Sequence, residues 1–118
     1  SGCYHMLLRW WRANRGTWYR GSCAYPETAI WCSEPEFYDD TKRSLETGSI
    51  QQADTDKSSI CDAIVTPEPG TLTFPEKRRR GLGGAVIREE QAPRPVATLA
   101  KQLKIGVAPG GAVAAAAA

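Results

Sequence analysis

The sequence predicts an α+β protein in which a small head of short strands and one N-terminal helix precedes an extended, largely irregular C-terminal arm. Two observations predict this division. Nine of the ten aromatic residues and three of the four cysteines fall within residues 1–38, so the material for a core is concentrated at one end of the 118-residue chain. Residues 66–70 then contain two prolines, each of which restricts its own φ and the residue before it. The predicted head is residues 1–65, and the predicted arm is residues 66–118.

Three elements are predicted at the start of the head. Residues 4–13 are predicted to form the N-terminal helix, because their apolar side chains recur at helical spacing and Gly16 can end the helix in the left-handed conformation. Residues 17–25 and 27–32 are predicted to form short strands that Pro26 separates. All four tryptophans lie in this stretch, which is therefore the predicted nucleus of the head.

The middle of the chain is polar and carries one predicted helix. Asp40 can begin this helix, residues 41–46 continue it, and Gly48 ends it. Residues 49–57 contain few apolar side chains and are predicted to be a loop. No glycine-containing calcium loop surrounds the acidic pairs of this region, which are interpreted as solvated loop acids: Asp39 with Asp40, and Asp54 with Asp56.

The apolar segments after the predicted loop are short. Residues 60–65 favour a strand through their β-branched content, although Ser58 or Ser59 could cap a helix there instead. Residues 71–74 are predicted to form a short edge strand. Residues 85–87 form an apolar patch that is too small for a core, so the arm is predicted to have no core of its own.

The arm contains one clearly delimited helix, predicted near residues 95–105. Pro95 stands at its first position, Gly106 follows it, and an apolar stripe recurs at positions i, i+3 and i+7. This stripe consists of Val96, Leu99 and Leu103. Because a helix of about ten residues is marginal alone in water, the stripe is predicted to dock on a partner. The alanine-rich segment over residues 108–118 is low in complexity and is predicted not to fold by itself.

The net charge of +2 conceals three blocks of alternating sign. Residues 1–25 carry four arginines and no acid, residues 26–76 carry eleven acids against three bases, and residues 77–118 carry eight bases against two acids. The densest basic run is predicted to be a mobile loop that binds phosphates or an acidic protein surface. It consists of Lys77, Arg78, Arg79 and Arg80.

Arginines alternate with aromatic residues in the predicted head, a composition typical of surfaces that stack on bases and neutralise phosphates. The aromatic side chains are equally consistent with a core, and Trp10, Trp18 and Trp31 fit that alternative. The other members of the stretch are candidate partner-binding residues at the rim of the head: Arg9, Trp11, Arg12, Arg15 and Arg20.

The cysteines leave two alternatives open. They are the candidate disulfide residues Cys3, Cys23, Cys32 and Cys61. None forms the closely spaced pair typical of a structural zinc site, so no metal is predicted. Two disulfides would suit a small secreted domain, whereas reduced, buried thiols would suit an intracellular protein.

No motif in the sequence predicts catalysis. His5 is the sole histidine, and at i, i+2 spacing its side chain diverges from that of Cys3, which argues against a Cys–His nucleophile. Residues 81–84 are glycine-rich but lack the Gly-Lys-Ser/Thr of a nucleotide site. No enzymatic activity and no cofactor are therefore predicted. No run of 18 apolar residues is present, so no membrane span is predicted either.

The leading hypothesis is a non-enzymatic structural or accessory subunit that binds a large macromolecular assembly through its basic arm. Its partners would be protein subunits of that assembly or RNA, in an intracellular or organellar setting rather than a secreted one. The alternative is a secreted two-disulfide binding module, either lectin-like or effector-like. A small hydrolase or nuclease built around His5 and the acidic loop is a third hypothesis.

Overall fold

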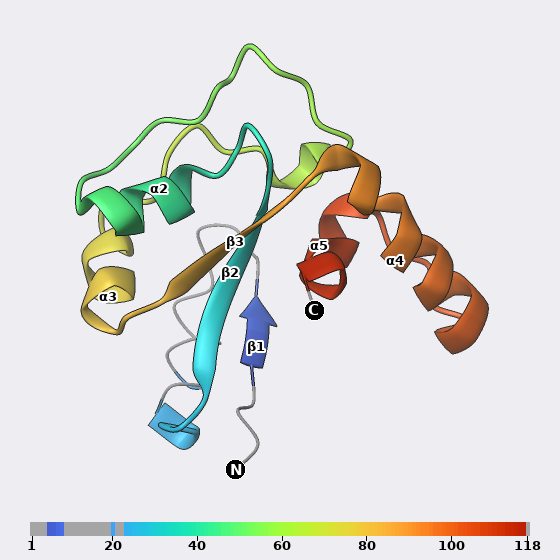
Figure 1. Ribbon diagram of the computed structural model, residues 1–118, viewed down its shortest axis with the longest axis horizontal. Coiled ribbons are helices and arrows are strands. Elements are labelled where there is room, and N and C mark those ends of the chain that lie inside the picture. Colours follow the sequence, from blue (N-terminus) through green and yellow to red (C-terminus); the bar gives the residue numbers. More distant parts are fainter. Residues whose placement is uncertain (1–4, 9–19, 21–22, 118) are drawn as a thin grey trace.

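A parallel sheet forms the centre of the protein. The computed structural model describes residues 5–8, 20 and 23–117 (Figure 1). Within these residues, three strands form one sheet in the order β1-β2-β3. They are β1 (His5–Leu8), β2 (Ala29–Pro35) and β3 (Gly83–Ile87). Both pairings are parallel, so the carboxyl ends of the strands meet at one edge of the sheet.

Helical segments make up most of the other regular structure in the described residues. They are α2 (Asp40–Thr47), the 3-10 turn η1 (Asp62–Ile64), α3 (Phe74–Arg79), the 3-10 turn η2 (Glu89–Gln91), α4 (Pro93–Thr98), the π-helical turn η3 (Leu99–Leu103) and α5 (Pro109–Ala117). Helix α5 contacts all three strands, whereas α2 contacts β2 and β3 and also α3. The two helices lie on opposite sides of the sheet in Figure 1.

The alternation of side chains along β3 explains why α2 and α5 cover opposite faces. Successive residues of a strand point to opposite faces, so Gly84 and Ile87 face different sides. Gly84 lies against Lys42 of α2, and a Cβ added there would be 2.6 Å from the Lys42 Cβ and 3.0 Å from its Cα. Ile87 instead packs in the cluster that contains Val113 of α5. Glycine at position 84 therefore allows α2 to approach the sheet closely.

The described core lies between the sheet and α5. It is formed by five buried residues, namely Cys61, Ile64, Ile87, Ala92 and Val113. Ala112 and Val113 are 0% exposed. The alanine-rich segment, predicted not to fold by itself, is thus a helix whose burial depends on the sheet. Alanine has the highest helix propensity, and its small side chain lets the helix pack close to the strands.

The predicted N-terminal helix over residues 4–13 is wrong at residues 5–8, which form β1. A run of three apolar residues after His5 fits a strand or a helix equally well by periodicity, and pairing of the backbone with β2 decides the outcome. The predicted strand over 17–25 is wrong where it is described, because Arg20, Cys23 and Ala24 are helical. The remainder of both predictions lies outside the described residues. The strand predicted over 27–32 is present as β2, shifted toward Pro35.

Two further strand predictions are replaced by helical structure. In residues 60–65 the chain forms η1, and the Ser59 hydroxyl oxygen accepts a hydrogen bond from the Cys61 N–H at 3.0 Å. The strand prediction is therefore wrong. A short helical turn forms instead, but its N-cap is Cys61 and no serine side chain caps it. The edge strand predicted over 71–74 is also wrong, because these residues turn into α3, with a proline near its first position.

The short helix predicted in the polar middle is confirmed. Helix α2 begins at Asp40 and ends before Gly48, whose φ of 79° is left-handed. The Gly48 N–H donates to the Ser44 carbonyl oxygen at 2.9 Å, which satisfies one of the last carbonyls of the helix. The preceding Asp39 makes no side-chain capping bond, so the helix start is stabilised by another residue, Glu34.

Residues 66–118 do not extend away from the head as an arm. Strand β3 pairs with β2, and α5 packs on the sheet, so both halves of the chain build one core. The helix expected near 95–105 corresponds to α4 and η3, which together are helical from Pro93 to Leu103. The helix ends at Lys104, whose φ of 56° is left-handed, rather than at Gly106. No helix in the described residues is long and apolar enough to cross a membrane.

Candidate functional site

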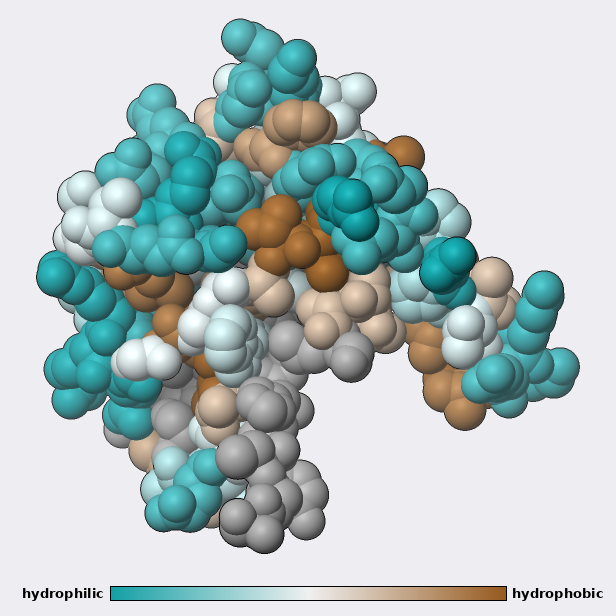
Figure 2. Space-filling view, viewed as in Figure 1, coloured by the Kyte–Doolittle hydropathy of each residue, from teal (hydrophilic) through white to brown (hydrophobic). Residues whose placement is uncertain are grey.

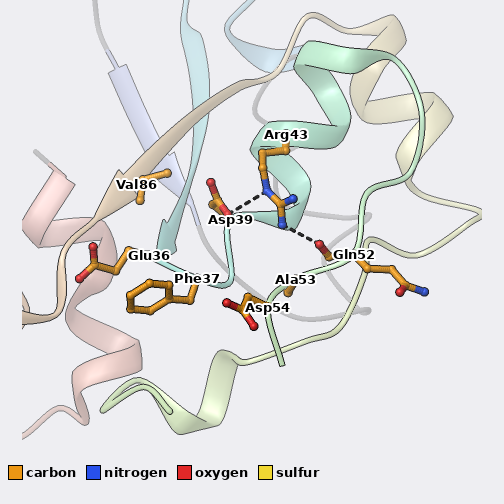
Figure 3. Close-up of a pocket in the computed structure, with 8 residues that line it drawn as sticks. All are labelled: Glu36, Phe37, Asp39, Arg43, Gln52, Ala53, Asp54 and Val86. Carbon is orange, nitrogen blue, oxygen red and sulfur yellow. Dashed lines mark hydrogen bonds and ion pairs between the residues drawn. The ribbon is translucent and has the colours of Figure 1, made fainter. Parts of the chain in front are cut away.

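A pocket of about 400 Å³ opens at the carboxyl edge of the sheet (Figure 3). In open parallel sheets, ligands bind outside the carboxyl ends of the strands, which makes this pocket the candidate site. Its walls come from the end of β3, the loop after β2, helix α2 and the loop that follows α2. The lining residues are Glu36, Phe37, Asp39, Arg43, Gln52, Ala53, Asp54 and Val86.

Arg43 joins two walls of the pocket. Its Nε donates to an Asp39 carboxylate oxygen at 3.0 Å, and its Nη2 donates to the Gln52 carbonyl oxygen at 2.6 Å (Figure 3). The ion pair with Asp39 spans one turn, at i and i+4. Asp39 is therefore paired rather than solvated, and the guanidinium holds the loop after α2 against the helix.

Phe37 places an aromatic ring beside the pocket in an unusual backbone conformation. Its φ of 70° lies in the left-handed region, which is rare for a bulky residue and costs free energy. The surrounding loops hold it there: the Asp54 N–H donates to the Phe37 carbonyl oxygen at 2.9 Å. The residue is 40% exposed, and the Lys57 ammonium lies 5.9 Å from the centroid of its ring.

A buried acidic junction lies behind the pocket, where β2 passes into α2. Glu34 is 3% exposed and Asp40 is 0% exposed. The Glu34 carboxylate accepts hydrogen bonds from the Thr41 N–H at 3.3 Å and the Lys42 N–H at 2.9 Å. A carboxylate on the first N–H groups of a helix satisfies unpaired donors and complements the helix dipole. The interpretation of Asp40 as a solvated acid is wrong.

The chemistry available in the pocket is polar binding. Its lining contributes carboxylates, one guanidinium and an amide, with no histidine, cysteine or lysine. The described residues contain no group of three or more His, Cys, Asp or Glu side chains that could hold a metal ion. Sequence reasoning missed Glu34, Phe37 and Arg43, because no motif surrounds them and only their spatial neighbours distinguish them.

The residues predicted to bind partners do not gather at this pocket. Four of them, Arg9, Trp11, Arg12 and Arg15, lie outside the described residues. Arg20 is described and exposed. Their role in binding stays a prediction.

The cysteines form no disulfide among the three that the structure describes, Cys23, Cys32 and Cys61. Cys32 and Cys61 are buried and Cys23 is exposed. The fourth candidate, Cys3, lies outside the described residues. The structure therefore contains no disulfide between any two of Cys23, Cys32 and Cys61.

The basic run predicted to be a mobile loop instead forms the end of α3 and its cap. Arg79 and Arg80 both form ion pairs with Glu76, at 2.5 Å and 2.9 Å. Arg78 donates to the Gly48 carbonyl oxygen at 3.1 Å, next to the end of α2, and Lys77 lies within α3. Glu76 lies three positions before Arg79 and four before Arg80, so its carboxylate neutralises part of this basic run.

Protonation of Glu76 should require strongly acidic conditions. Hydrogen bonds from Arg79 and Arg80 lower the pKa of the Glu76 carboxyl from 4.5 to about 2. A carboxyl with a depressed folded pKa stabilises the fold above its unfolded pKa, and this contribution disappears as the pH falls from about 4.5 to about 2. An NMR titration of the Glu76 side-chain carbonyl should show the low midpoint.

The matched control for this titration removes the two partners. In an Arg79→Gln, Arg80→Gln variant, the Glu76 midpoint should rise toward 4.5, because the hydrogen bonds that favour the carboxylate are weakened. A wild-type midpoint near 4.5 would show that these ion pairs do not persist in solution.

The apolar stripe predicted to dock on a partner lies along α4 and η3. Figure 2 shows apolar surface toward the end of this projecting segment. Leu103 is 60% exposed and Ile105 is 48% exposed, whereas Val96 and Leu99 are half-buried. Docking of Val96, Leu99 and Leu103 on a partner stays a prediction.

Solved enzyme structures share this arrangement. No family model matches the chain, and no curated protein matches it. The chain is 34% identical to a T.th. threonine deaminase over 82% of its length, with a TM-score of 0.77. It is 30% identical to serine racemase from Dictyostelium discoideum over 82% of its length, with a TM-score of 0.72. It covers 35% of the first of those chains and 30% of the second.

A third solved structure, at lower sequence identity, is also that of an enzyme. A pyridoxal 5'-phosphate-dependent aspartate racemase matches 98% of the chain at 13% identity, with a TM-score of 0.72, and 36% of that protein is covered. At this identity the likeness concerns the fold alone. The chain thus spans about a third of the length of the solved structures that it matches.

These comparisons correct the functional hypothesis drawn from the sequence. The prediction of a non-enzymatic accessory subunit is wrong, because the similar structures are deaminases and racemases. The basic arm and RNA binding receive no support from them, and the secreted two-disulfide module is likewise replaced by an enzyme-like architecture.

Proposed function

We propose that this chain forms part of a pyridoxal phosphate-dependent enzyme that deaminates or racemises a small amino acid such as threonine or serine. The observation that carries the proposal is the likeness to threonine deaminase, at 34% identity and a TM-score of 0.77. The similarity to serine racemase at 30% identity points to the same substrate class. Pyridoxal phosphate supplies an electron sink for reactions at the α-carbon of amino acids.

The residues present do not fit the whole cofactor. Pyridoxal phosphate is held by a lysine imine and by a partner for its pyridine nitrogen. All five lysines of the sequence lie in the described residues, and none of them lines the pocket. The pocket lining is also rich in carboxylates, which oppose a phosphate group. We therefore derive no catalytic step through the cofactor from these residues.

The contribution of this chain is instead structural support at the carboxyl edge of the sheet. Glu34 fixes the start of α2 against β2, and Arg43 ties the following loop to that helix. Packing of α5 against the strands completes the core that supports the sheet. In the proposed enzyme, these contacts orient the loops after β2 and β3 toward residues contributed by the rest of the protein.

A chimera tests the proposed function. This chain would replace the matching segment of the T.th. threonine deaminase, and ammonia release from L-threonine and L-serine would be measured. The expected result is pyridoxal phosphate-dependent ammonia release above that of the deaminase with the segment deleted. A folded chimera, judged by circular dichroism, that releases no ammonia from either amino acid would contradict the proposal.

A further inference from the structure

The five lysines of the chain share one property: none of them lines the pocket at the carboxyl edge of the sheet. A lysine that forms an imine must lose its proton near neutral pH, which requires desolvation or a neighbouring cation. Lys42 is the lysine nearest the core, and its ammonium lies 3.8 Å from the Glu46 carboxylate. Its stem packs under Gly84 of β3. Lys42 is thus engaged in an ion pair on α2 and does not line the pocket.

The other four lysines also lie away from the pocket lining. Lys57 is exposed and lies over the Phe37 ring. Lys101 and Lys104 are exposed at the end of the projecting helix, where the Lys104 ammonium donates to the Lys101 carbonyl oxygen at 2.9 Å. Lys77 lies on α3, away from the carboxyl edge of the sheet. No lysine is thus placed in a closed cavity within the described residues.

We infer that the lysine that forms an imine with pyridoxal phosphate is supplied by polypeptide outside these 118 residues. This inference rests on the proposed function. Its basis is a mismatch: the architecture is that of enzymes more than twice as long, and none of the five lysines of this chain lines its pocket. The chain would then be one part of a composite site, with its own polar pocket at the carboxyl edge of the sheet.

The chemistry of imine formation provides a direct test. The lysine nitrogen adds to the aldehyde carbon of pyridoxal phosphate, and the aldehyde oxygen leaves as water. Borohydride then delivers a hydride to the carbon–nitrogen double bond and leaves a stable secondary amine. Mass spectrometry of the digested protein locates this adduct on a particular lysine, without any need for catalytic activity.

The full 118-residue chain would be incubated with pyridoxal phosphate, reduced with borohydride and digested. We expect low occupancy spread over several lysines, with the same distribution when the chain is unfolded in urea. The variant Lys42→Arg should leave the total unchanged, because Lys42 is not a preferred site. A near-complete adduct on a single lysine that disappears in urea would overturn the inference.

The chimera separates failure of this inference from failure of the proposed function. In the active chimera, the adduct should map to a lysine of the deaminase portion. An adduct confined to a lysine of this chain, together with ammonia release, would overturn the inference and leave the proposed function standing. A folded chimera with neither ammonia release nor a site-specific adduct would overturn the proposed function instead.

Discussion

Replacing Val113 with aspartate should destabilise the protein by at least about 4 kcal/mol, because it buries a carboxylate with no partner. Val113 is 0% exposed and lies in the cluster with Ile64 and Ile87. Domains of this size are stable by about 5–15 kcal/mol, so the substitution should remove a large share of the free energy of unfolding. Urea unfolding followed by circular dichroism measures the effect.

The control for this substitution lies on the same helix. Ala115 is exposed, and Ala115→Asp introduces the same charge into α5 without burying the carboxylate. This variant should lose no more than about 1 kcal/mol. Equal losses at positions 113 and 115 would show that α5 does not pack on the sheet in solution.

Replacing Glu34 with alanine should cost about 3–5 kcal/mol, since it removes a buried carboxylate that accepts from two backbone N–H groups. The Thr41 and Lys42 amides of α2 lose these acceptors in the interior of the protein. Glu34→Gln should cost less than Glu34→Ala, because the amide oxygen can still accept one of the two bonds. Urea unfolding ranks the two variants.

Hydrogen exchange gives the prediction for Glu34 a local readout. The Thr41 and Lys42 amides should exchange faster in Glu34→Ala than in the unmodified protein, even under conditions where both are folded. Glu46→Ala is the matched control, since Glu46 is an exposed acid on the same helix, and it should change stability by less than about 0.5 kcal/mol. Unchanged exchange at Thr41 in Glu34→Ala would refute the capping role.

The candidate site shows how little of its geometry is accessible to sequence reasoning. The acids at 39, 40 and 54 are visible in the sequence, but their environments are not. Asp39 is paired with Arg43, Asp40 is fully buried, and Asp54 lies at the pocket next to Phe37. A carboxylate in water and a carboxylate in the interior have the same local sequence signal, so only the fold distinguishes them.

Function was misjudged for a related physical reason. A scaffold for a composite site needs packing residues and helix caps, and these residue types also occur in non-enzymatic proteins. In the enzyme that we propose, the imine-forming lysine comes from polypeptide outside this chain, so no lysine motif in these residues reveals the cofactor. Comparison with solved structures supplied the correction, because backbone arrangement persists where motifs are absent.

The sequence by itself determined the elements whose signals are local. Gly48 ends α2 because glycine readily adopts the left-handed conformation, and the helix around Pro95 follows from its apolar spacing. Each of these depends on residues within a few positions of one another.

Only the tertiary structure decided the rest. Parallel pairing joins β1, β2 and β3 into one sheet, and paired residues of β2 and β3 lie more than fifty positions apart in the sequence. No local pattern specifies which segments pair. The alanine-rich segment becomes core in α5 because the sheet offers a face to cover, and Glu34 becomes a helix cap because the turn after β2 returns α2 to it. Long-range contacts stabilise these elements, so the local sequence signal for each of them is weak when its segment is considered alone.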